Sequence, residues 1–141
     1  PSLNFKIDTI QAAFILNNFK NLNQKILLRN KNAEYYRKKL ISKIKLPKVL
    51  KNEKHSFYSF TIIAPNRDKL KNYMFKKGIE TKIQHPILIP NQKAYKFNVN
   101  KDKLSNAKKL VKKILCVPIN ENLKRSELNY VVSTINSFYQ K

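Results

Sequence analysis

The amino-acid sequence predicts a mixed α/β (α+β) fold, in which a long N-terminal helical arm precedes a small three-stranded sheet covered by helices. Two observations favour this fold. Apolar residues recur at helical spacing through the first 46 residues, and strand-like segments then alternate with helical ones. The predicted division is a helical arm over residues 1–46 and a small α/β domain over residues 47–141. A chain of 141 residues can bury a core without metals or disulfides.

The arm begins with a strong signal for helix initiation. Asp8 can accept hydrogen bonds from the free amides of a first helical turn, and Gln11 stands three residues later, as in a capping box. Ile10, Ala13 and Phe14 then supply an apolar stripe. These features predict a helix that starts directly after Asp8.

The helical pattern weakens over residues 21–24, so we expect a kink or a short break there. A second helical pattern follows, and it is predicted to reach residue 44 and to end before Pro47. Such an arm carries more apolar surface than one small domain needs, so part of it should contact another domain or subunit. Because the chain begins at Pro1 without a methionine, we expect a fragment of a longer protein.

Three segments of the small domain are predicted to be strands. Residues 57–64 are aromatic and β-branched, residues 79–85 alternate between polar and apolar, and residues 115–117 are short and apolar.

Three helices are predicted between and after these strands. The first covers residues 67–77 and stops at Gly78, the single glycine of the chain, as a left-handed C-cap requires. The second is capped by Ser105, and the third covers residues 125–139, where apolar residues follow helical spacing closely.

The net charge of +22 makes a basic nucleic-acid-binding module one alternative function. However, lysines are spread over every predicted element, and only four arginines occur, so compositional drift explains the charge equally well. A nucleic-acid module would show affinity that falls steeply with salt.

The sequence contains few residues that point to chemistry. One cysteine excludes an internal disulfide, and with two histidines it does not support a structural zinc site. We interpret Cys116 as a small buried apolar residue in a strand. No glycine-rich phosphate loop or nucleophile motif is present, and no apolar run approaches the length of a membrane span. A cytoplasmic setting fits best.

Five blocks nevertheless resemble, in the same order, the sugar aminotransferases of the DegT/StrS class. Residues 4–13 (NFKIDTIQAA) resemble the N-x-R-M-x-x-x-Q-A-A segment of that family, and residues 29–36 (RNKNAEYY) match its R-x-x-x-A-x-x-Y. Residues 67–81 carry R-D-x-L and G-I-x-T, and residues 84–95 stand where the family has H-Y-P and Q-x-A-Y. Residues 116–118 fall where it has an L-P before its C-terminal helix.

This resemblance implies the C-terminal portion of a fold type I enzyme that depends on pyridoxal phosphate. The full enzyme would move an amino group from an amino acid, such as glutamate, to a keto-sugar nucleotide for polysaccharide or glycoconjugate biosynthesis. In the family, an upstream domain provides the Schiff-base lysine and most of the cofactor site, so this fragment alone is expected neither to hold the cofactor nor to catalyse. Family members are homodimers with sites at the subunit interface. No specific nucleic acid and no membrane are expected as partners.

The resemblance also assigns candidate site residues. Asn4 is expected to reach the cofactor phosphate of the partner subunit, together with Lys6, which replaces the family's arginine and loses its bidentate fork. Gln84, His85 and Tyr95 are expected to bind substrate, although Gln84 and His85 stand in place of the usual H-Y. By residue type alone, Asn4 is a turn residue, Lys6 a solvated lysine, His85 a structural histidine and Tyr95 a packing residue.

One further alternative remains open. A truncated, non-catalytic pseudoenzyme could keep only the dimerisation surface of the family. Coding sequence upstream of the same gene would distinguish it from a domain of an active enzyme.

Overall fold

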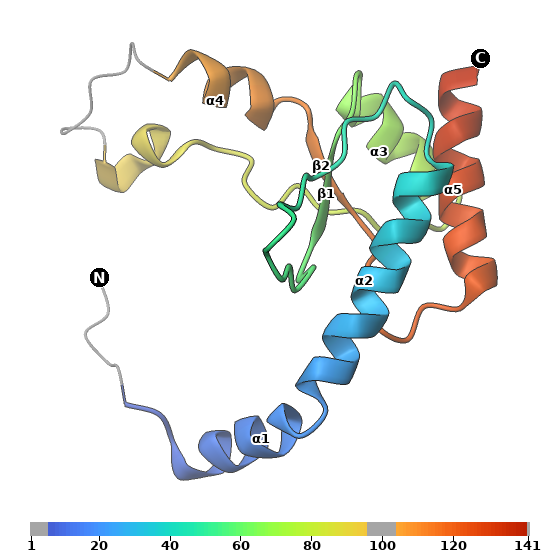
Figure 1. The fold of residues 1–141 in the computed structure, drawn as a ribbon. Coiled ribbons are helices and arrows are strands. Elements are labelled where there is room, and N and C mark those ends of the chain that lie inside the picture. The colour runs from blue at the N-terminus through green and yellow to red at the C-terminus, as the bar shows by residue number, and fades with distance from the viewer. Residues whose placement is uncertain (1–5, 96–103, 141) are drawn as a thin grey trace.

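The computed structural model describes residues 6–95 and 104–140. Its sheet is packed against α2, α3 and α5, while α1 and α4 project away from this body in different directions (Figure 1). The elements, in chain order, are α1 (Thr9–Phe19), α2 (Leu22–Lys39), β1 (Phe60–Ile63), α3 (Arg67–Lys76), the short 3-10 turns η1 (Ile89–Asn91) and η2 (Lys93–Tyr95), α4 (Ser105–Val111), β2 (Ile114–Val117) and α5 (Arg125–Gln140).

The first helix of the arm begins directly after Asp8, as predicted. The Oδ1 atom of Asp8 accepts a hydrogen bond from the amide of Ile10 at 2.8 Å, which caps α1. The expected break is also confirmed, because α1 ends at Phe19 and α2 begins at Leu22. The arm therefore consists of two helices rather than one.

The end of α2 differs from the prediction. The helix stops at Lys39 instead of reaching residue 44, and Leu40 is already extended. Asn136 of α5 donates from Nδ2 to the carbonyl oxygen of Lys39 at 2.9 Å and accepts from the amide of Ile41 at 3.0 Å. A side chain from the far end of the sequence thus satisfies the backbone groups that a longer helix would have paired.

The sheet has two strands, not the three that were predicted. β1 and β2 pair antiparallel, with Phe60 opposite Val117 and Ile63 opposite Ile114. Residues 79–85 meet β2 at a single bridge, in which Lys82 exchanges two backbone hydrogen bonds with Cys116. The segment bends at residue 84, just ahead of a proline that has no amide to donate, and so it leaves β2 before further pairs form.

The helices of the small domain are largely as predicted. Gly78 has φ +72° and follows α3, where the amide of Ile79 returns to the carbonyl oxygen of Met74, so the left-handed C-cap is confirmed. The cap predicted for α4 is wrong: Ser105 is its first helical residue, and Leu104 occupies the cap position without a side-chain bond. α5 matches its predicted range within one residue.

The core lies between the sheet, α2, α3 and α5. Three aromatic rings form its centre: Tyr36 is 5.1 Å from Phe60, and Phe60 is 5.8 Å from Phe57, measured between ring centroids. All three side chains are almost completely buried. Because Tyr36 belongs to α2, the second half of the arm is part of the same core as the sheet. None of the helices in the described ranges is long and apolar enough to cross a membrane.

Candidate functional site

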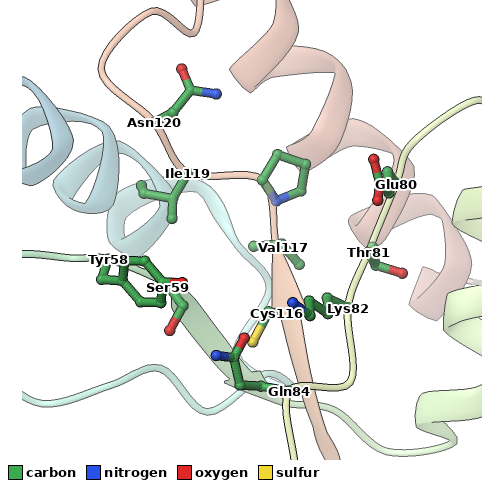
Figure 2. A pocket seen from close by; sticks show the side chains of 11 residues that line it. Tyr58, Ser59, Glu80, Thr81, Lys82, Gln84, Cys116, Val117, Ile119 and Asn120 are labelled. Carbon is green, nitrogen blue, oxygen red and sulfur yellow. The ribbon is translucent and has the colours of Figure 1, made fainter. Parts of the chain in front are cut away.

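A groove with a volume of about 370 Å³ opens at the end of the sheet where β2 finishes. Three separate segments form it: the residues before β1, the segment beside β2, and the end of β2 with its following loop (Figure 2). It is lined by Tyr58, Ser59, Glu80, Thr81, Lys82, Gln84, Cys116, Val117, Pro118, Ile119 and Asn120.

The sheet positions the walls of this groove. Tyr58 and Ser59 lead directly into β1 and lie on one side of the end of β2 (Figure 2). Thr81 and Lys82 lie on the other side, held there by the bridge between Lys82 and Cys116, whose hydrogen bonds measure 3.0 and 2.8 Å. The walls are therefore fixed by backbone pairing on both edges of β2.

The floor and the walls differ in chemistry. Cys116 is 7% exposed, and its Sγ atom is 3.2 Å from the hydroxyl oxygen of Thr61, so it packs as the small buried residue that its sequence context predicts. The walls instead present polar groups: three hydroxyls (Tyr58, Ser59, Thr81), two amides (Gln84, Asn120), one carboxylate (Glu80) and one ammonium group (Lys82). An open groove lined this way suits a ligand with many hydrogen-bonding groups.

The groove contains one of the predicted substrate residues. Gln84 lines it and is half-buried. The neighbouring His85 is exposed and is not among the lining residues, and Tyr95 lies in η2 with 51% of its surface exposed, also outside the lining. Lys6 is exposed just ahead of α1, whereas Asn4 lies outside the described residues. The structure therefore brings only Gln84 to this groove.

Several groove residues were missed by sequence reasoning. The pattern of residues 57–64 predicts a strand that includes Tyr58 and Ser59, but β1 begins only at Phe60, so these two residues form a wall instead. Thr81 and Asn120 come from segments 39 residues apart, and no local pattern connects them. Polar residues beside strand ends are the one local signal that could have indicated them.

The face of α1 is a second candidate surface. None of its eleven residues is buried. Its large apolar side chains are exposed by 43–71%, namely Ile10, Phe14, Ile15, Leu16 and Phe19. In the described part of the chain, no group of three or more histidine, cysteine, aspartate or glutamate side chains could hold a metal ion.

Relatives with known names match almost the whole chain but only part of their own length. A pleiotropic regulatory protein of Geobacillus stearothermophilus is 30% identical over an alignment of 142 positions. The alignment covers 97% of this chain and 38% of that protein. The dTDP-4-amino-4,6-dideoxy-D-glucose transaminase of Shigella dysenteriae is 29% identical over 94% of this chain and 38% of its own length. The chain thus spans about two fifths of these relatives.

Solved structures also match almost the whole chain and only part of their own length. A DegT/DnrJ/EryC1/StrS aminotransferase from Brucella abortus superposes with a TM-score of 0.91 at 27% identity, over 96% of this chain and 37% of that chain. A Bacillus subtilis protein solved with bound cofactor PMP shares the fold with a TM-score of 0.85 at 23% identity, over 96% of this chain and 33% of that chain.

The family assignment follows from the extent of the sequence match. Residues 1–136 match the sequence pattern of one family, which leaves only five residues outside the match. The match includes the arm, the sheet and the first three quarters of α5. This chain belongs to the DegT/DnrJ/EryC1/StrS aminotransferase family.

Proposed function

We propose that this chain works as the C-terminal part of a pyridoxal phosphate-dependent aminotransferase that transfers an amino group from an amino acid to a keto-sugar nucleotide. The observation that carries this proposal is the family match over residues 1–136. Two relatives, from Shigella dysenteriae and Aneurinibacillus thermoaerophilus, are named as transaminases of dTDP-linked amino sugars. Glutamate is the amino donor that we would test first.

The residues of this chain fit a partial contribution to the cofactor site. When bound, pyridoxal phosphate supplies the electron sink for transamination and needs a lysine held in its pocket. In the described ranges no lysine is buried, so we propose that the cofactor lysine comes from another domain. Lys6 carries an exposed ammonium group just before α1, which suits a contact with a phosphate, and we propose that Asn4 joins it there.

We propose that the groove at the end of β2 forms part of the sugar-nucleotide site. Its polar walls can donate to and accept from sugar hydroxyls, and Gln84 offers both kinds of group. His85 follows at the exposed rim, where it could contact a phosphate or a base of the bound nucleotide. Tyr95 offers an exposed ring in η2, which suits stacking on a base once another domain or subunit closes over it.

The arm supplies the proposed contact with the rest of the enzyme. The exposed apolar side chains of α1 would be costly to leave in water, since burial of apolar surface contributes about 25 cal/mol per Å². We propose that residues 1–46 pack on the large domain or on the partner subunit of a homodimer. In this arrangement the 141-residue chain alone does not catalyse transamination.

The test uses the complete protein, produced from the whole reading frame and mixed with pyridoxal phosphate. We expect an absorption band of bound cofactor that changes when glutamate is added and returns when a keto-sugar nucleotide follows. A folded complete protein that gives no cofactor band would overturn the proposal. That result would favour the non-catalytic pseudoenzyme or the nucleic-acid-binding module.

A further inference from the structure

Three polar side chains on one face of α2 hold the loop that follows β2. Arg29, Asn32 and Tyr36 are spaced by three and four residues, so they lie above one another on the helix. The Nε atom of Arg29 donates to Oε2 of Glu121 at 2.8 Å. The loop comprises residues 118–121, of which residues 118–120 line the groove.

The other two side chains bond the backbone of the same loop. Nδ2 of Asn32 donates to the carbonyl oxygen of Asn120 at 2.8 Å. The hydroxyl of Tyr36 donates to the carbonyl oxygen of Pro118 at 2.7 Å, from a ring that is completely buried. Burial also raises the pKa of this hydroxyl, so it remains a donor throughout the neutral range. Three side chains on one face of α2 thus hold three of the four loop residues.

The same helix holds the segment that leads to Tyr58 and Ser59. Nδ2 of Asn30 donates to the carbonyl oxygen of His55 at 2.8 Å. Nη1 of Arg29 lies 3.5 Å from the carbonyl oxygen of Phe57. Phe57 has φ +45°, a conformation that a bulky residue rarely adopts, and its amide donates to Nδ1 of His55 at 2.9 Å. Such a backbone persists only where its surroundings fix it.

These contacts bear directly on the groove. Phe57 immediately precedes Tyr58 and Ser59, which form one wall, and residues 118–120 line the groove directly after the end of β2 (Figure 2). We propose that α2 is the positioning element of the groove and that Arg29, Asn32 and Tyr36 set the distance between the wall formed by Tyr58 and Ser59 and the loop that follows β2. None of the three lines the groove, so they act through the residues that they hold. The role in substrate binding rests on the proposed function.

A matched pair of tyrosines makes this inference testable. Tyr139 of α5 donates its hydroxyl to the carbonyl oxygen of Pro65 at 2.5 Å, and Pro65 lies just beyond β1. Tyr36 and Tyr139 therefore make the same kind of bond, a buried phenol to the carbonyl oxygen of a proline beyond a strand. They do so at opposite ends of the sheet, and only the bond of Tyr36 is at the groove.

The experiment compares Tyr36→Phe with Tyr139→Phe in the complete protein. We expect Tyr36→Phe to raise the KM for the keto-sugar nucleotide by about three- to tenfold, the size of one lost hydrogen bond, without changing the KM for glutamate. Tyr139→Phe should change neither constant. Equal effects of the two variants, or equal changes in both KM values for Tyr36→Phe, would show a general structural role and overturn the proposal.

Amide hydrogen exchange tests the positioning independently of activity. Tyr36→Phe should speed exchange over residues 119–122 and leave the residues around Pro65 unchanged, whereas Tyr139→Phe should do the reverse. If the wild-type protein turns over no keto-sugar nucleotide, the proposed function fails, but this exchange pattern still decides the positioning role. Unchanged exchange over residues 119–122 would overturn it.

A third variant covers the case in which Tyr36→Phe does not fold. Asn32→Ala removes the bond to Asn120 at a half-buried position, and alanine favours the helix. It should give the same split between the two KM values and the same faster exchange over residues 119–122. If Asn32→Ala gives neither effect, α2 does not position this loop.

Discussion

Helices α1 and α5 differ in burial although the sequences of both carry apolar residues at helical spacing. α5 buries six residues against the sheet, α2 and α3, including Leu128 and Ile135. α1 has an equally clear start and an apolar stripe, yet it buries none of its residues. An amphipathic pattern therefore predicts that one face of a helix will be buried. It does not predict whether the domain that contains the helix, or another domain or subunit, buries that face.

The largest effect should come from removing volume under α5. Ile135 is completely buried, so Ile135→Ala is expected to lower the free energy of unfolding by about 2–5 kcal/mol. Phe14→Ala on α1, where the ring is 69% exposed, should change it by less than about 0.5 kcal/mol. Urea unfolding followed by circular dichroism measures both. A large loss for Phe14→Ala would mean that α1 packs on this core.

Phe14 should matter instead for assembly. If α1 packs on the partner subunit of a homodimer, Phe14→Ala in the complete protein should weaken dimerisation by about 2 kcal/mol, or roughly thirtyfold. Phe75→Ala is the matched control, because Phe75 on α3 is 76% exposed and lies outside the arm. Sedimentation equilibrium distinguishes them, and equal behaviour of the two variants would remove the special role of α1.

Removing a helix cap should have a smaller effect on stability, and it should again distinguish α1 from α5. Asp8→Ala should weaken α1 by about 1 kcal/mol, which would speed exchange of the Ile10 amide about fivefold without moving the midpoint of global unfolding. Glu127 accepts from the amide of Lys124 at 2.7 Å at the start of α5. Glu127→Ala should therefore lower the global midpoint. A shift of that midpoint by Asp8→Ala would contradict the independence of α1.

The smallest effect depends on pH and concerns the loop that enters α5. Hydrogen bonding from its own backbone amide, and then from Arg29, lowers the pKa of Glu121 below the usual glutamate value. A lowered folded pKa stabilises the protein above the unfolded pKa of about 4.3, and this contribution is lost as the pH falls through the folded value. Wild type should exceed Glu121→Gln in stability at pH 7, with the difference disappearing as the pH falls through the folded pKa of Glu121. A difference that grows on acidification would exclude this origin.

Local signals explain what the sequence could predict. The Asp8 cap, the left-handed Gly78 and the apolar spacing of α5 each depend on neighbours within a few residues, and all three form as expected. The family resemblance was also recognisable, because its blocks are short runs in a fixed order.

Long-range contacts explain what it could not. α2 stops at Lys39 because Asn136, almost a hundred residues away, satisfies its end. The alternation of residues 79–85 suited a strand, but pairing stops after Lys82. For the site, Gln84 was found by resemblance, while Ser59 and Asn120 meet in the groove only through the fold.

The narrow sheet has a consequence for how this chain would aggregate. Lys45 forms a single bridge with β1 and Lys82 a single bridge with β2, so an exposed lysine stands beside each strand. Charged residues at sheet edges oppose the addition of strands from other molecules, whereas the exposed stripe of α1 does not. Aggregates of the overproduced chain should therefore remain helical by circular dichroism and should not bind dyes that recognise cross-β fibrils.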